Sequence, residues 1–444
     1  MLIYIYLFLL IISLFITIRS IYQLITFHRV FQKKRSKAQL KAQKKQKSFH
    51  LHTKSFQIKL MIRVILGAAI GLALFVNYAT QMDITIDRDH DLNMLVGPAI
   101  SDSNYVIVEE KIQTFIDNTK PLTLVIGYID GEDQYLLSYG KIGVKEGELN
   151  QDSVYEIGSI SKAITGLMLA QSIDDGLISI TDTVEDHIDY TFDENSVVPT
   201  ITLQDLVTHT SGLNPLPTSN KFIFELVTSF AFGGNPYRGM TEEEMLKSMN
   251  RTRSLNPPSW EYSNYGAGIL GMCLTAAHQI SYEELLQELI VEPLGLTNTS
   301  TVRDHDAMYV DGYQDVLRLG RLTLAIKTTP WLLADGIVSA GGVRSSGSDM
   351  LKLLNGLINH DIENSEAAMT PLYQINDSVG IGMFWITNEL ESGESVTWHN
   401  GSTGGYSSFI GMNEHEQGIF ILSNESRDVT ELGIDILGSL VNSI

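Results

Sequence analysis

The chain has 444 residues, with 31 Lys or Arg and 52 Asp or Glu, which gives a formal net charge of −21. Residues 1–80 hold 13 of the basic and none of the acidic side chains, so residues 81–444 carry a net charge of −34. That acidity argues against a nucleic-acid binder, because phosphate backbones require clustered Lys and Arg. The single cysteine, Cys273, excludes an internal disulfide and a cysteine-rich metal site. It lies in the apolar stretch GILGMCLTAA, where we expect a buried side chain.

Residues 1–80 are predicted to form a membrane anchor. Two apolar runs, residues 1–18 and 60–79, approach the length of a bilayer-spanning helix. The loop between them, residues 19–59, carries 12 Lys or Arg and no acid, which predicts a cytoplasmic position beside anionic lipid. Both spans would then place the rest of the chain outside the cell, as a multi-pass protein of the cell membrane. A cleaved signal peptide is the alternative, but the first run has no basic segment before it and no A-x-A site after it.

The remaining chain is predicted to be a polar, irregular linker (residues 81–104) followed by one extracellular domain (residues 105–444). The domain begins with a short helix in KIQTFIDNTK and a hairpin in LTLVIGYIDGEDQYLLSYGKIG. A mainly helical block follows, including YEELLQELIVEPLGL, which ends at Pro293 and Gly295. Closely spaced strands then return in VGIGMFWITN, ESVTWHN, YSSFIGMN and QGIFILSN, before a last helix. The pattern predicts an α/β (α+β) fold, in which helices flank an antiparallel sheet beside a mainly helical lobe.

The stretch YEIGSISKAITGLMLAQ places Ser159 three residues before Lys162 at the start of an apolar-periodic run. On a helix these two side chains share a face. The lysine could therefore accept the hydroxyl proton if desolvation lowers its pKa, or remain cationic and stabilise a neighbouring anionic base. Serine is also a preferred helix N-cap, so both interpretations remain open at this point. The same spacing recurs at Ser138 and Lys141, where a predicted strand ends and no helix follows, and context separates the two copies.

A second element, PPSWEYSNYGAGILG, places Tyr262 and Asn264 between a proline-rich turn and an apolar helix. A tyrosine near a lysine can be stabilised as a phenolate and can act as a general base. An asparagine offers a donor and an acceptor to an amide substrate. The alternative is an interfacial aromatic residue beside a helix cap.

A third element, TWHNGSTGGYSSFIG, places His399, Asn400 and Gly401 at the end of a strand. Glycine there lets a substrate approach the backbone closely. The N–H of Ser402, just beyond, could join that of Ser159 in holding an oxyanion. Alone, the element is only a strand-to-turn signal.

Together the three elements resemble the serine β-lactamase and penicillin-binding protein superfamily, whose signature is S-x-x-K, then S-x-N or Y-x-N, then K-T-G or H-x-G. The segments ITLQDLVTHTSGL and VSAGGVRSSGSDMLKLL look like the class C-type branch, and the resemblance covers roughly residues 105–425. It implies a serine β-lactamase-like fold and an acyl-enzyme on Ser159, whose proton Lys162 and Tyr262 exchange. The resemblance further implies substrate contacts from Asn264, His399, Asn400 and Gly401, and an oxyanion hole made by Ser159 and Ser402.

Two histidines qualify this resemblance. His399 stands where β-lactamases of this class usually carry a lysine, and a histidine is largely neutral at pH 7. H-x-G forms look more like the D,D-peptidases and esterases of the branch, so efficient β-lactam hydrolysis is not expected. His209, in THTSGL, is a tempting base, but in this family the segment shapes the structure around the site.

The leading hypothesis is a membrane-tethered serine hydrolase that acts outside the cell on D-alanyl peptides of the wall, or on a D-alanyl ester. The alternatives are a class C-like β-lactamase and a non-catalytic wall-binding scaffold on the same fold. Expected partners are a peptidoglycan stem peptide, a D-alanyl ester or a β-lactam, together with membrane lipid. No cofactor or metal is expected, because the chain has no H-E-x-x-H and EIGSISK lacks the first part of a P-loop.

Overall fold

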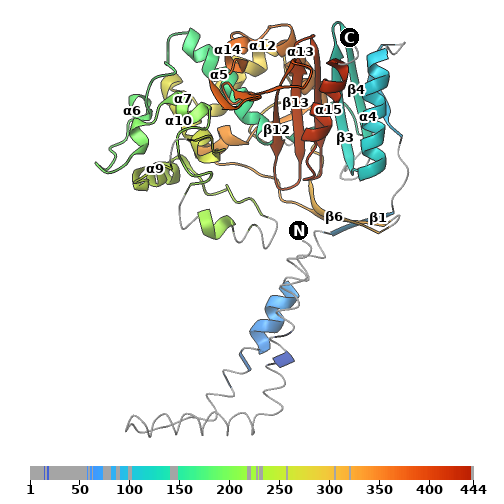
Figure 1. Cartoon of the computed structure of the whole chain (residues 1–444). Coiled ribbons are helices and arrows are strands. Elements are labelled where there is room, and N and C mark those ends of the chain that lie inside the picture. The colour runs from blue at the N-terminus through green and yellow to red at the C-terminus, as the bar shows by residue number, and fades with distance from the viewer. Residues whose placement is uncertain are drawn as a thin grey trace. The chain divides into compact units, whose positions relative to one another are not determined.

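The protein is described here by a computed structural model (Figure 1). It describes residues 82–86, 91–98, 103–140, 149–217, 222–226, 229, 234–256, 259–304, 307–319 and 322–441, with scattered residues between 15 and 73. The chain divides into two compact units, Met1–Thr85 with Leu324–Ile326 and Ile86–Thr323 with Lys327–Ile444. The second unit contains the main sheet and every candidate site residue.

The centre of the second unit is a nine-stranded sheet, within which each described pair of neighbouring strands is antiparallel. The strands follow in the order β2 (Asn93–Val96), β4 (Asp133–Gly140), β3 (Thr123–Asp130), β14 (Gln417–Ser423), β13 (Ser407–Asn413), β12 (Ser395–Ser402), β11 (Ile386–Glu389), β10 (Val379–Ile381) and β9 (Tyr373–Asn376). Early and late strands therefore meet at the β3–β14 pairing, although a mainly helical block separates them in the chain.

The helical segments cover both faces of this sheet. In chain order they are α4 (Ser103–Thr119), α5 (Ile160–Asp174), α6 (Val184–His187), the 3₁₀ turn η1 (Val198–Thr200), α7 (Leu203–Val207), α9 (Glu242–Arg251), α10 (Asn264–His278), α11 (Tyr282–Leu286), the π-helical turn η2 (Gln287–Val291), α12 (Glu292–Leu294), the 3₁₀ segment η3 (Asp335–Ala340), α13 (Gly347–Ile358), α14 (Ser365–Met369) and α15 (Thr430–Val441). Figure 1 shows α4 and α15 beside the sheet on one side and the α6, α7, α9 and α10 lobe on the other.

Two hydrophobic cores form because successive strand residues point to opposite faces of the sheet. Phe409 and Ile421 are register partners and belong to the core that α4 and α15 cover. Ile410 and Phe420, the next pair, belong to the larger core that contains α5, α10 and α13. Strands β13 and β14 are buried along their whole length, which explains why they read as continuous apolar runs rather than alternating ones.

A short antiparallel pair, β5 (Val154–Glu156) with β8 (Arg344–Ser346), lies outside the main sheet. It matters for the site because β5 leads directly into α5 and β8 follows η3. The two remaining strands of the second unit, β6 (Tyr313–Leu319) and part of β7 (Leu322–Lys327), come between α12 and η3 in the chain.

The predicted linker is wrong in part. Residues 93–96 form β2, which pairs with β4 at the edge of the main sheet, and α4 begins at Ser103. The sequence did not indicate β2 because both Asn93 and Met94 are exposed on this edge strand, so the two-residue alternation of a half-buried strand is absent. A further strand, β1 (Met82–Ile86), lies in the first unit.

The predicted membrane segments fall mostly outside the described residues. Segment 1–18 has only Phe15 and Ile18 described, and segment 60–79 only residues 61, 62 and 64–73. Within the part of the chain that is described, no helix reaches both the length and the hydropathy that crossing a membrane demands. The basic loop between the two segments also lies almost wholly outside the described residues.

Candidate active site

Ser159 stands where β5 turns into α5. Gly158 makes this turn with a φ of +52°, a conformation that glycine adopts without strain. An added Cβ at Gly158 would lie 2.6 Å from the backbone nitrogen of Ser402, so the turn is pressed against the end of β12. Ser159 occupies the N-cap position with helical backbone angles, but its side chain makes no capping hydrogen bond. The N-cap interpretation therefore does not account for this hydroxyl.

Two side chains converge on the Ser159 hydroxyl, as the resemblance implies. The Lys162 Nζ lies 3.0 Å from the Ser159 Oγ, one helical turn along α5. The phenolic oxygen of Tyr262 lies 2.7 Å from the same Oγ, although 103 residues separate the two in the chain. Lys162 Nζ also lies 4.8 Å from the centroid of the Tyr262 ring. The first two elements of the signature are thus brought to one oxygen atom.

Burial decides the resting protonation of this pair. Lys162 is fully buried and its pKa is lowered well below the usual 10.5, with desolvation as the cause. Desolvation also raises the pKa of Tyr262, and the hydrogen bond to Ser159 opposes that rise only in part. The tyrosine therefore rests as a phenol, and the amine is the group suited to take the serine proton. The phenolate considered from the sequence is not favoured as the resting state.

The lysine amine is also held from its other side. Its Nζ donates to the carbonyl oxygen of Ala340 at 2.5 Å, at the end of η3. A neutral amine has two N–H groups and one lone pair. With one N–H directed at Ala340, the amine remains able to exchange a proton with Ser159.

His209 has a supporting position, as expected. Its Nδ1 accepts the backbone N–H of Ser263 at 3.3 Å, and its carbonyl oxygen accepts the N–H of Glu261 at 2.9 Å. Its ring lies 4.6 Å from that of Tyr262, centroid to centroid. Burial lowers its pKa well below 6.5, so the ring is neutral. These contacts clamp residues 261–263 and aim the tyrosine.

Asn264 begins α10 and points toward a residue that the sequence did not indicate. Its Nδ2 donates to the phenolic oxygen of Tyr237 at 3.2 Å, and its backbone N–H donates to the carbonyl of Pro215 at 2.9 Å. Tyr237 stands in no recognisable motif, and only the tertiary contact identifies it. Its pKa is raised by burial, so it presents a neutral phenol beside the amide.

His399 lies on β12 opposite Ile410, on the sheet face that looks toward α5. Its Nδ1 lies 2.6 Å from the carbonyl oxygen of Asn400, which makes Nδ1 the donor and leaves Nε2 as an acceptor. Desolvation lowers its pKa to about 3, and repulsion from Lys162, whenever that amine is protonated, acts in the same direction. The third element therefore carries a neutral histidine, in agreement with the expectation from the sequence.

Gly401 permits the close packing of β12 on the turn before Ser159. An added Cβ at this position would lie 2.0 Å from the carbonyl oxygen of Ile157 and 2.4 Å from the Ser408 hydroxyl. Ser408 itself donates to that same carbonyl at 2.8 Å. Any side chain at position 401 would separate the two segments that carry Ser159 and Ser402.

The two predicted oxyanion donors lie on adjoining segments, because the turn at Gly158 packs against Ser402. Thr403 N–H donates to the carbonyl of Tyr406, which closes the β12–β13 turn. Bonded and non-bonded pairs alternate along an antiparallel ladder, so the Ser402 N–H points away from β13. On that side β11 pairs β12 only as far as Trp398. Outside the helices and strand ladders, the N–H of Ser159 has no backbone partner among the described residues.

Asn400 is not brought to the site, which corrects the prediction that it binds substrate. It lies opposite Phe409, on the sheet face that α15 covers, and its Nδ2 donates to the hydroxyl of Thr430 at 2.8 Å. The reason is the two-residue period of a strand: with His399 and Gly401 facing α5, Asn400 faces the other way. Only its carbonyl, which receives His399 Nδ1, contributes to the site.

The other residues singled out from the sequence behave as structural residues. Cys273 is buried in α10 as predicted, and burial raises the pKa of its thiol. Ser138 is buried within β4, while Lys141 lies outside the described residues. In the described part of the chain, no group of three or more His, Cys, Asp or Glu side chains is arranged to hold a metal ion.

The chain is similar to curated bacterial proteins over most of the second unit. Protein flp of Staphylococcus aureus (strain NCTC 8325 / PS 47) is 24% identical over 339 residues, which are 71% of this chain and 63% of flp. Penicillin-binding protein 4* of Bacillus subtilis (strain 168) is 26% identical over 317 residues, or 67% of each protein. This chain therefore covers less than two thirds of the length of flp.

Solved structures show the same fold. The octameric penicillin-binding protein homologue from Pyrococcus abyssi superposes with a TM-score of 0.62 at 26% identity, over 76% of this chain and 77% of that one. A class C beta lactamase from Rhodobacter sphaeroides superposes with a TM-score of 0.61 at 21% identity, over 76% of this chain and 99% of that one. The sequence profile described as Beta-lactamase matches residues 108–437, and this chain belongs to that family.

Proposed function

We propose that this protein is a serine hydrolase that forms an acyl-enzyme on Ser159. The observation that carries the proposal is the convergence of the Lys162 amine and the Tyr262 phenol on the Ser159 hydroxyl, at 3.0 and 2.7 Å. A serine that served only as a helix cap would have no need of a fully buried lysine, since burying an amine without an ionic partner is costly.

The reaction follows from these positions. Lys162 takes the Ser159 proton while Oγ forms a bond to the substrate carbonyl carbon, and the N–H groups of Ser159 and Ser402 hold the resulting oxyanion. As the tetrahedral centre collapses, the bond to the leaving oxygen or nitrogen breaks and that atom receives a proton from Tyr262. Tyr262 recovers a proton from Lys162. Water then repeats the sequence on the ester to release the acyl group.

The substrate class proposed is a D-alanyl peptide or a D-alanyl ester of the cell wall. Similarity to a penicillin-binding protein of Bacillus subtilis and to a penicillin-binding protein homologue of Pyrococcus abyssi supports it. The proposed location is the outer face of the cell membrane, with residues 1–80 as the anchor. A tether would keep the site near a wall substrate and raise its effective concentration there.

A β-lactamase is the second candidate function, supported by family membership. The neutral His399 weighs against it, because the carboxylate of a β-lactam would meet no fixed cation at that position. A non-catalytic scaffold is the third possibility, and the Lys162 amine and the Tyr262 phenol at the Ser159 hydroxyl weigh against it.

Covalent labelling separates these functions. The purified chain is incubated with a fluorescent penicillin, with an activated D-alanyl thioester and with a p-nitrophenyl ester, and the intact mass is recorded. A hydrolase gains an acyl adduct on Ser159 that Ser159→Ala cannot form, while Ser138→Ala, at the second copy of the spacing, still forms it. Absence of adduct and of turnover with all three probes would instead identify a scaffold.

A further inference from the structure

A cavity of about 350 Å³ lies beside the candidate active site. Its lining is apolar or neutral throughout, and consists of Leu216, Leu226, Ser229, Gly234, Pro236, Tyr237, Gln314, Thr328, Trp331, Thr403 and Gly404. No Asp, Glu, Lys, Arg or His is among these residues. We call this cavity the acyl pocket. A charged group placed in it would lose its hydration, and no oppositely charged side chain among these residues could pair with it.

The acyl pocket adjoins two residues of the candidate active site, Ser402 and Asn264. Thr403 directly follows Ser402, the predicted oxyanion donor, so its Cα lies about 3.8 Å from that of Ser402. Tyr237 forms the facing wall and accepts the hydrogen bond from Asn264, the predicted substrate-orienting amide. The cavity is therefore close enough to the candidate site to receive part of a group attached to Ser159.

Trp331 is the largest side chain in the pocket wall. Its ring lies 5.4 Å from that of Tyr237, edge to face, and an added Cβ at Gly404 would lie 2.7 Å from its Nε1. The indole therefore occupies the space that a side chain at position 404 would need. Its position determines how far the pocket extends from the oxyanion donors.

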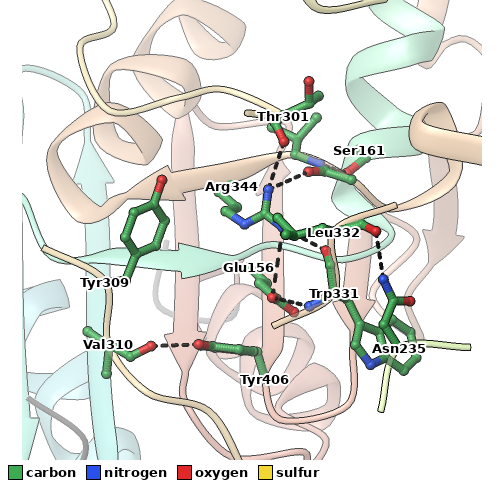
Figure 2. A network of polar contacts seen from close by, with 12 residues as sticks. Glu156, Ser161, Asn235, Thr301, Tyr309, Val310, Trp331, Leu332, Arg344 and Tyr406 are labelled. Atoms are coloured by element: carbon green, nitrogen blue, oxygen red, sulfur yellow. Dashed lines mark hydrogen bonds and ion pairs between the residues drawn. The ribbon is translucent and has the colours of Figure 1, made fainter. Parts of the chain in front are cut away.

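A buried ion pair fixes the backbone of Trp331 (Figure 2). The Trp331 N–H donates to the Glu156 carboxylate at 2.7 Å, and the Trp331 carbonyl accepts from the Arg344 guanidinium at 2.6 Å. Glu156 and Arg344 lie 3.9 Å apart and are 5% and 2% exposed. Glu156 belongs to β5, three residues before Ser159, so the pair ties the pocket wall to the strand that carries the candidate nucleophile.

We propose that this pocket receives an uncharged, apolar acyl group and that Trp331 limits its length. The inference rests on the proposed function and makes its substrate class more specific. An N-acylated D-alanyl group is a suitable occupant, because acylation has removed the charge of its amine. A D-alanyl ester with a free ammonium is a poor one, because none of the described residues that line the pocket carries a carboxylate to receive it.

The first experiment measures kcat/KM for p-nitrophenyl acetate, butyrate, hexanoate and octanoate. Each methylene buried in the pocket raises kcat/KM about fourfold until the pocket is filled, and longer chains then lose activity. Trp331→Ala moves this optimum to a longer chain. The matched control is Leu332→Ala, because Leu332 is 49% exposed and does not line the pocket. It keeps the original optimum.

The second experiment compares an N-acetyl-D-alanyl thioester with a D-alanyl thioester that carries a free ammonium. The wild-type chain prefers the acetylated donor by at least about tenfold. Gln314→Glu places a carboxylate in the pocket and reverses or abolishes that preference, while Gln374→Glu, on the exposed edge strand β9, does not.

The outcomes separate the two proposals. If no adduct forms on Ser159 with any ester, the proposed function fails. If the adduct forms but the rates are independent of chain length and of the ammonium, the acyl pocket is refuted while the hydrolase stands. If Trp331→Ala does not fold, Trp331→Phe replaces it in the test. The phenylalanine keeps an aromatic wall in the pocket, and the optimal acyl chain length increases by a smaller step.

Discussion

The side-chain nitrogen of Lys162 lies 3.0 Å from the hydroxyl oxygen of Ser159, and the lysine has no exposed surface. The described residues offer no carboxylate contact to this lysine, and its acceptors are a hydroxyl and the Ala340 carbonyl. A buried amine without an anionic partner gives up its proton more readily than one in water. This relationship makes the lysine a base, and a measurable pH dependence follows.

Acylation should require the neutral form of Lys162. The acylation rate should therefore rise with pH and level off, with a midpoint well below the ordinary lysine pKa of 10.5. Lys162→Arg and Lys162→Met should both lose about 10²- to 10⁴-fold in kcat/KM, because arginine keeps the charge but cannot accept a proton. A midpoint near 10.5, or an active Lys162→Arg variant, would show that the lysine is not the base.

Tyr262→Phe tests the proton return to the leaving group. The variant keeps the aromatic contact with His209 and loses the phenol that touches Ser159. We expect kcat/KM for a D-alanyl peptide to fall about 10²-fold, and that for a p-nitrophenyl ester to fall much less, because p-nitrophenolate leaves without a proton. Equal losses with both substrates would assign Tyr262 to positioning alone. Tyr309→Phe serves as the control, because the Tyr309 hydroxyl accepts the backbone N–H of Asp304 and makes no contact with Ser159.

His399→Lys tests why β-lactams are expected to be poor substrates. A cation at the third element would give the β-lactam carboxylate a charge-assisted hydrogen bond, worth about 1.5–3 kcal/mol. The second-order acylation rate with a penicillin should rise about 10- to 100-fold, with little change for an ester that lacks a carboxylate. His360→Lys adds the same charge at an exposed position and should leave both rates unchanged. A rise for both substrates would mean that the lysine acts by another route.

His399 should also make stability depend on pH. In the folded chain its pKa is lowered to about 3, whereas in the unfolded chain it protonates near 6.5. Between these values the unfolded state binds more protons, so the free energy of unfolding falls as the pH falls from about 6.5 toward 3. His209 acts in the same direction. Urea titrations at several pH values should show a shallower dependence in His399→Asn, by up to about 1.4 kcal/mol per pH unit.

Gly401→Ala should separate the two halves of the oxyanion hole. The added methyl group would overlap the Ile157 carbonyl, at 2.0 Å, so β12 must move away from the turn before Ser159. We expect a loss of about 10²-fold or more in kcat, since the Ser402 N–H moves out of reach. Gly438→Ala is the control, because an added Cβ there meets only the Leu390 side chain, at an ordinary 3.6 Å. Full activity in Gly401→Ala would remove Ser402 from the mechanism.

The sequence alone was sufficient for the elements whose signals are local. The β3–β4 hairpin, the strands β12, β13 and β14 and the helix α15 were all predicted, because turn residues and continuous apolar runs mark them. Strand β2 was not predicted, because its side chains are exposed and its partner β4 lies about 40 residues away. Pairing between strands that are distant in the chain is not visible in the local pattern of apolar and polar residues.

The side chains that could do the chemistry at Ser159 can be identified from the amino-acid sequence, because S-x-x-K, Y-x-N and H-x-G are local patterns of residue type. What those side chains are able to do depends on the folded structure. Burial holds the Lys162 amine and the His399 ring neutral, strand register turns Asn400 to the opposite face, and packing brings Tyr237 and Trp331 to the acyl pocket. The protonation state of a side chain and the direction in which it points depend on the atoms that surround it. Those atoms come from segments that lie far apart along the chain.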